Sequence, residues 1–410
     1  MIEGDEVIPM IQKELIEKIY VAASMQRWMD HIRPVEFTEL DKQAHKMVIA
    51  YVIAKYEELM NGKGRLEWIK LIEGGFFEFL QRVVLTDIKP PIFNRIKSKH
   101  GDVLNRLILD NLSKALQGAE GLQKRFENYI MNPREAPFEK RILKAAHDLA
   151  TFWEFRTIYK LNQTLYGIDV TKKRIENEVE AHHSLTGVQQ IVLYKKAQGF
   201  IDLCGQLRFQ QRWAQTQRIP KTSVLGHMLI VAIFSYLLSL EITSCKERLY
   251  NNYFAALFHD LPEVLTRDIV SPVKRSIEGL EDTIKEIEQE LLDESILPLL
   301  PKKWHSEMRY FYFHEDPFEN KIIEDGKIRK GLSTEALNRK YDSEAYRPLD
   351  GNIIFLCDKL AAYLEAVLSI KHGINSRVLT DAKNKIRNQY RQTAVGGSSL
   401  GYLFEYDYSV

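Results

Sequence analysis

Apolar residues recur every three or four positions along most of the chain, which is the period of an amphipathic α-helix. Two later segments, which begin near His227 and Asn352, are apolar almost all round, and helices of that kind are normally buried. Alternating strand patterns are scarce. The pattern therefore predicts an all-α fold. In the first half it predicts helices over Ile8–Met29, Ala44–Met60, Leu66–Val84, Val103–Leu116 and Arg141–Leu161.

Two regions depart from this helical pattern. The polar region Phe318–Asp350 is expected to form a long loop or a small β-excursion. The segment after Thr393 is rich in Gly and Ser and then aromatic, so we expect it to dock in an extended form on the body of the protein. A length of 410 residues suggests two or three domains.

Composition narrows the class of protein. The chain is 45% hydrophobic and 28% charged, as an ordinary globular protein is. A formal net charge of +1 gives no general attraction to nucleic acid or to an anionic membrane. The longest apolar run, Met228–Leu238, is too short to span a bilayer, and no signal peptide is recognisable in the first residues. Three cysteines without metal-type spacing indicate reduced thiols. These features predict a cytoplasmic protein.

The segment Asn252–Lys274 concentrates ionisable residues directly after an apolar run. His259 and Asp260 lie at the end of a predicted core helix, where an unpaired charge is costly unless it coordinates a metal. Glu263 follows His259 by four residues and so shares its helix face. By itself the His-Asp pair is a weak signal.

Two other apolar helices supply further ligand types, because His227 begins one and Asp358 lies within another. Together with His259 and Asp260 they give two imidazoles and two carboxylates, a set that suits a divalent cation of the Mn, Co, Ni or Zn type, with Mg also possible. We expect one such ion per chain. The alternative is a buried polar network whose members satisfy one another.

The order His, His-Asp, Asp resembles that of the HD-domain metal-dependent phosphohydrolases, and the surrounding residues resemble the bacterial 5'-deoxynucleotidase branch. The resemblance covers about 208–370. An Arg-Trp pair precedes the first His, and HDxxEVLTxD, PVK and DxLxAYL follow in that order. The matching residues here are Arg212 and Trp213, His259 to Asp268, Pro272 to Lys274, and Asp358 to Leu364.

The resemblance implies a role for each matching residue. His227, His259, Asp260 and Asp358 would hold the metal. Catalysis would fall to Glu263, as general acid/base, and to Asp268, near the attacking water or the leaving oxygen. Phosphate would contact Arg212 and Lys274, and Trp213 would pack against the sugar or base. Each also has a plainer interpretation: surface carboxylates, solvated cations and a core tryptophan. Gly226 stands where the resemblance leads us to expect an acidic residue.

We therefore expect a phosphohydrolase that acts on nucleoside or deoxynucleoside 5'-monophosphates through a metal-activated water. Two alternatives are a regulatory protein that binds a nucleotide without hydrolysing it, and a hydrolase of a nucleoside triphosphate or an alarmone. In each case the partner is a small-molecule nucleotide.

A long-period repeat links the two halves. Gln26-Arg27-Trp28 recurs 185 residues later as Gln211-Arg212-Trp213. Aligned from there, His45 parallels His227, Gly74-Gly75 stands in place of the His-Asp pair, Thr86-Asp87 parallels Arg267-Asp268, and Asp148 parallels Asp358. Because glycine has no ligating side chain, we expect the first half to hold no metal and its pocket to be empty or closed.

The repeat predicts a pseudo-dimer of two helical bundles within one chain. The expected parts are a degenerate HD-like domain at 1–165, a connecting helical region at 166–200, the HD domain at 201–393, and a tail at 394–410.

Overall fold

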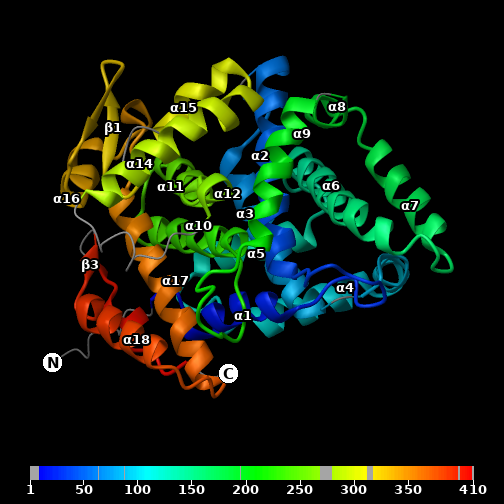
Figure 1. Ribbon diagram of the computed structural model, residues 1–410, viewed down its shortest axis with the longest axis horizontal. Helices are drawn as coiled ribbons and strands as arrows, with labels where there is room; N and C mark the ends of the chain where they lie inside the picture. The colour runs from blue at the N-terminus through cyan, green and yellow to red at the C-terminus, as the bar shows by residue number, and fades with distance from the viewer. Residues whose placement is uncertain are drawn as a thin grey trace.

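The computed structural model describes residues 9–62, 64–86, 88–193, 195–267, 279–311, 317–395 and 398–408. It confirms the all-α class, since the strands form only two small hairpins in the described residues (Figure 1). The helices in chain order are α1 (Lys13–Ser24), α2 (Glu39–Asn61), α3 (Trp68–Leu85), α4 (Pro90–Leu112), α5 (Glu120–Met131), α6 (Pro137–Leu161), α7 (Ile168–Glu180), α8 (Thr186–Leu193), α9 (Lys195–Gln206), α10 (Val224–Glu241), α11 (Lys246–Phe258), α12 (Glu263–Thr266), α14 (Leu280–Leu291), α15 (His305–Phe311), α16 (Thr334–Ala336), α17 (Gly351–Lys371) and α18 (Arg377–Tyr390).

Helix α10 lies at the centre of the fold, with α2, α11 and α17 around it (Figure 1). Every residue from Val224 to Ser239 is buried, as the absence of a polar face predicts. By length and apolarity this helix alone, among the described residues, could cross a membrane, and 89% of it is buried inside the protein. The N-terminus of α10 is capped by Ser223, whose side chain accepts a hydrogen bond from the Gly226 backbone N–H.

Helix α2 of the first half packs directly against α10. The two helices meet near their N-termini, where Ser223 Oγ donates to Asp41 Oδ1 at 2.5 Å. Farther along, the ring of Tyr51 on α2 contacts Phe254 and Phe258 of α11. One continuous core therefore extends through both halves.

The segment that follows α6 is helical rather than a flexible tether, because α7, α8 and α9 occupy it. Gly187 of α8 lies so close to α2 that an added Cβ would approach the Ile53 backbone at 2.6 Å. This connection is therefore packed on the first half.

The two irregular regions also take shape. Within Phe318–Asp350, β1 (Lys321–Glu324) pairs antiparallel with β2 (Lys327–Lys330), as the alternative of a small β-excursion predicts. The C-terminal segment contains β3 (Ala394–Val395), β4 (Ser398–Ser399) and a 3-10 turn at Gly401–Phe404. Phe404 and Tyr408 are fully buried, so this segment docks on the body, though as a hairpin and a turn rather than fully extended.

Helix boundaries were less well predicted than helix existence. Helix α4 begins at Pro90, because proline is tolerated in the first turn where its missing N–H has no partner to lose. Helix α5 was not predicted, since only Leu122, Phe126 and Tyr129 on it are buried.

Candidate metal centre and phosphate site

His227 lies in the first turn of α10 and is fully buried. Its Nε2 faces Asp358 Oδ1 of α17 at 3.1 Å and Asp260 Oδ2 at 3.7 Å. The cap at Ser223 fixes the start of the helix and therefore fixes the direction in which this imidazole points.

His259 immediately follows α11 and comes to the same point from another side. Its Nδ1 lies 2.7 Å from the carbonyl oxygen of Ala256, so Nδ1 carries the proton and donates to that oxygen. The lone pair is then on Nε2, which is buried and has no hydrogen-bond partner among the described residues. A backbone carbonyl that fixes the tautomer in this way is typical of a metal-ligating histidine.

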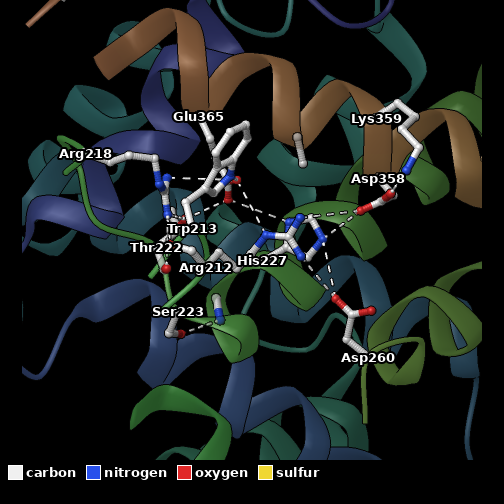
Figure 2. Close-up of polar contacts among 12 residues, drawn as sticks. Arg212, Trp213, Arg218, Thr222, Ser223, His227, Asp260, Asp358, Lys359 and Glu365 are labelled. Carbon is white, nitrogen blue, oxygen red and sulfur yellow. Dashed lines mark hydrogen bonds and ion pairs between the residues drawn. The ribbon is translucent and has the colours of Figure 1, made fainter. Parts of the chain in front are cut away.

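The four predicted metal ligands come together in the structure (Figure 2 shows three of them). Ligand atoms of His227, His259 and Asp358 all lie within 4.8 Å of one another. The Oδ2 atom of Asp260 is 3.3 Å from His259 Nε2. This nitrogen and oxygen donor set, with a buried imidazole nitrogen left unsatisfied, fits a divalent ion. We call these four residues the ligand group.

Burial and neighbouring charge act against each other at this centre. Burial, aided by Arg212, lowers the pKa of His227. For His259 burial also lowers the pKa, but the Asp260 carboxylate outweighs it and the pKa is raised. Although burial raises it, the pKa of Asp358 is held well below its usual value by Lys359 and His227. The carboxylates are thus ionised, as metal ligands must be.

Arg212 lies beside the ligand group. Its guanidinium is 3.3 Å from Asp260 Oδ2, 3.8 Å from Asp358 Oδ1 and 3.5 Å from Glu365 Oε2. These carboxylates outweigh the effect of burial and raise its pKa, so the side chain stays charged. A guanidinium held at the edge of a metal centre is well placed to bind a phosphate group.

Trp213 adopts a left-handed backbone conformation with φ of 57°, which is uncommon for a residue of this size. Its indole N–H donates to Glu365 Oε2 at 2.8 Å. The side chain is half-buried, so it is neither a solvated group nor a fully enclosed core residue.

Glu365 is a central residue that the sequence interpretation missed. It is buried on α17, and besides Trp213 it accepts a hydrogen bond from Thr222 Oγ1 at 2.6 Å. Its Oε1 is 3.8 Å from His227 Nδ1, so it places a negative charge behind the imidazole without a hydrogen bond to it. Burial opposes its ionisation, yet Arg218 and Arg212 lower its pKa to about 2. Its place seven residues after Asp358, on the same helix face, was a signal that could have found it.

Glu263 begins α12 and is buried, and its charge helps to raise the pKa of Arg212. It therefore lies near the Arg212 guanidinium. Asp268 and Lys274 lie outside the described residues.

The departure at Gly226 has a structural explanation. A Cβ built on this residue would be 2.9 Å from both Asp41 Oδ1 and a Leu40 methyl group. A side chain at this point would force Asp41 or Leu40 to shift, because α2 of the first half approaches so closely. The carboxylate near the start of α10 is supplied by Asp41 instead.

In the first half, His45 and Asp148, which the repeat aligns with His227 and Asp358, do not face a common pocket. His45 Nε2 is bonded to the carbonyl oxygen of Ile201 at 3.0 Å, so the ring faces α9. Asp148 accepts from Lys144 and His182. The Gly74-Gly75 pair does not face a pocket, since Leu143 and Met47 fill the space beside it.

Comparison with known proteins agrees with this geometry. Residues 204–387 match the family model of the HD domain, and this part of the chain belongs to that family. Part of the chain is also similar to a 5'-deoxynucleotidase of Pasteurella multocida (strain Pm70), with 29% identity over 115 residues. That match covers 26% of this chain and 56% of the relative, so the chain spans about half the length of the curated protein that it matches.

Proposed function

We propose that the HD domain of this chain is a divalent-metal-dependent phosphohydrolase that removes the phosphate from nucleoside or deoxynucleoside 5'-monophosphates. The observation that supports it most directly is the convergence of two imidazole Nε2 atoms and two ionised carboxylates beside the Arg212 guanidinium. A pure nucleotide binder has no need of an ionised metal-ligand set. The similarity to the Pasteurella 5'-deoxynucleotidase favours a nucleoside monophosphate as the substrate.

The ligand group would hold the ion. When bound, a divalent ion lowers the pKa of a coordinated water and stabilises charge on a phosphoryl oxygen. Around it, Arg212 binds the phosphate by exchanging part of its contact with Asp260 and Asp358 for phosphate oxygens. Glu365 places its negative charge behind the His227 imidazole and keeps the Trp213 indole in place.

Glu263 exchanges a proton with the attacking water or with the leaving 5'-oxygen. Its position at the start of α12, close to Arg212, supports this role. The half-buried Trp213 lies next to Arg212, and we assign it the sugar of the substrate.

A direct test is release of inorganic phosphate by the purified full chain. The protein is assayed with Mn, Co and Mg in turn, against ribo- and deoxynucleoside mono- and triphosphates. We expect turnover of 5'-monophosphates that is abolished by a chelator and restored by metal. Hydrolysis of triphosphates alone would contradict the monophosphate assignment, and no turnover with any metal would contradict the enzyme assignment.

A further inference from the structure

The first half repeats the Arg-Trp-Glu trio of the HD domain contact for contact. Trp28 Nε1 donates to Glu154 Oε2 at 2.8 Å, and Arg27 Nε donates to the same oxygen at 3.0 Å. Trp28 has a φ of 57°, the value found at Trp213. Strained backbone of this kind persists where the surrounding structure fixes it, and it is concentrated at functional sites.

The backbone around the trio fixes the register between the halves. Gln26 forms a β-bridge with Thr38, as Gln211 does with Ser223. Thr38 then caps α2, and Ser223 caps α10. Four residues beyond its cap, α10 carries His227, and at the same place α2 carries Lys42.

Helices α6 and α17 can be aligned in the same way. Glu154 corresponds to Glu365, and seven residues before each stand His147 and Asp358. The contact between the helices is kept, because Lys42 Nζ lies 3.1 Å from His147 Nε2 just as His227 Nε2 lies 3.1 Å from Asp358 Oδ1. A lysine and a histidine therefore occupy the places of two metal ligands.

The His-Asp pair has its counterpart on α3. The residue after α3, Thr86, and the residue after α12, Arg267, both have left-handed φ, of 58° and 65°. Counting back from these two points places Glu78 and Phe79 where the HD domain has its His-Asp pair, and Arg82 at the place of Glu263. This register replaces the earlier alignment with Gly74-Gly75.

The substitutions reverse the charge of the site. Arg27, Lys42, Lys46 and Arg82, which we call the cation cluster, include two lysines with no exposed surface. Lys46 pairs with Glu78. Arg27 and Arg82 share Glu39. Within the described chain no carboxylate forms a salt bridge with the Lys42 ammonium, whose hydrogen-bond partner is His147.

A buried ammonium without a salt-bridge partner is costly. Burial lowers the pKa of Lys42 well below its usual value; the Glu39 carboxylate opposes this shift, but the positive charges of Arg27, Lys46 and Arg82 add to it. Where the HD domain gathers carboxylates at its metal centre, the first half gathers four cations, and among the described residues Lys42 is the one of them with no carboxylate at salt-bridge distance. Arg82 and His147 are only half-buried, so the cluster reaches the surface.

We propose that residues 1–165 are a degenerate copy of the HD domain whose former metal centre is now a metal-free binding site for a phosphate monoester dianion. Arg27 and Arg82 supply guanidinium forks, Lys42 supplies the charge that the metal supplies in the other half, and the phosphate completes its coordination. The site binds its ligand without hydrolysing it, because no ligand set remains to hold a metal.

The test uses the full chain stripped of metal with a chelator that is then removed, so that hydrolysis plays no part. Calorimetric titration is carried out with inorganic phosphate, deoxyadenosine 5'-monophosphate and, as the phosphate-free control, deoxyadenosine. We expect about one phosphate-containing ligand per chain and no binding of the nucleoside. A larger affinity for the nucleotide than for inorganic phosphate would identify the natural ligand as a nucleotide, and equal affinities would identify it as phosphate.

Variants then locate the site. Lys42→Met keeps the buried volume, and the half-exposed Arg82→Gln serves as a second variant that leaves the core intact. Each should weaken phosphate binding about 10-fold or more, the scale of a lost charge-assisted hydrogen bond. Arg174→Gln, at an arginine that pairs with Glu178 along α7 and belongs to neither site, should not weaken it. Absence of phosphate binding to the metal-free chain, or loss only in Arg212→Ala, in the other half, would overturn the proposal even if the HD domain proves to be an active hydrolase.

Discussion

The two halves of this chain build the same trio of arginine, tryptophan and glutamate and then place opposite charge beside it. In the HD domain the trio adjoins the ligand group, whose ionised carboxylates surround Arg212. In the first half it adjoins the cation cluster, which contains a buried lysine in contact with His147. The helical scaffold therefore does not determine which kind of ligand a site would bind. That depends on the sign of the charges gathered in its interior.

The largest expected difference between the halves is in metal binding. Asp358→Ala should abolish bound metal and lower phosphohydrolysis by about 10³-fold, the upper end of the effect of removing one electrostatic stabiliser. His147→Ala, at the corresponding place on α6, should leave the metal content unchanged. Elemental analysis of both purified variants checks this. Loss of metal from His147→Ala would break the comparison.

Catalysis should depend on Glu263 by a smaller factor. Glu263→Gln keeps the shape of the side chain but removes its proton-transfer capacity, so kcat should fall about 10²-fold. Bound metal should stay at the wild-type level, because Glu263 is outside the ligand group. Steady-state kinetics at saturating metal give the answer, and a wild-type kcat would remove Glu263 from the proposed chemistry.

The metal ligands could be predicted from the sequence, because the residue types themselves indicate their chemistry. His227, His259, Asp260 and Asp358 are polar residues in apolar helices, and such residues need a partner or a metal. The structure brings all four together. The all-α fold follows in the same way from helical periodicity.

The other residues could not be predicted, because their places depend on how the helices of the two halves align. Helical periodicity does not fix that alignment. His45 was paired with His227 because both are histidines at the start of apolar helices. Counting from the caps shows that Lys42, not His45, has the equivalent place. Glu365 was missed because a single glutamate in an apolar helix gives no sign of the arginines that another segment brings to it.

A smaller difference is expected between variants of Glu365 and Glu154, the glutamates of the two trios. Glu365→Gln removes the negative charge behind the His227 imidazole and should weaken metal affinity about 10- to 100-fold, the usual cost of changing a group behind a ligating histidine. Titration of metal-free protein with Mn, followed by recovery of activity, measures this. The matched variant Glu154→Gln should keep the wild-type metal affinity. If both variants lose affinity equally, the effect is on folding and not on His227.

The smallest expected effect concerns the contact between the halves. Gly226→Ala places a methyl group 2.9 Å from Asp41 Oδ1 and from Leu40, and overpacking of this kind costs about 1–3 kcal/mol of unfolding free energy. Gly101→Ala is the control, because nothing lies within 4 Å of its added Cβ. Chemical denaturation measures both.

The contact between Gly226 and Asp41 also predicts how substitutions at these two residues combine. In an Asp41→Ala background the methyl group at position 226 meets one obstacle fewer, so Gly226→Ala should cost less there than in the wild type, although Leu40 still opposes it. The difference between the two costs is the coupling between α2 and α10 at this point. Equal costs in the two backgrounds would mean that Asp41 yields freely to a larger residue. The first half would then not constrain the start of the helix that carries His227.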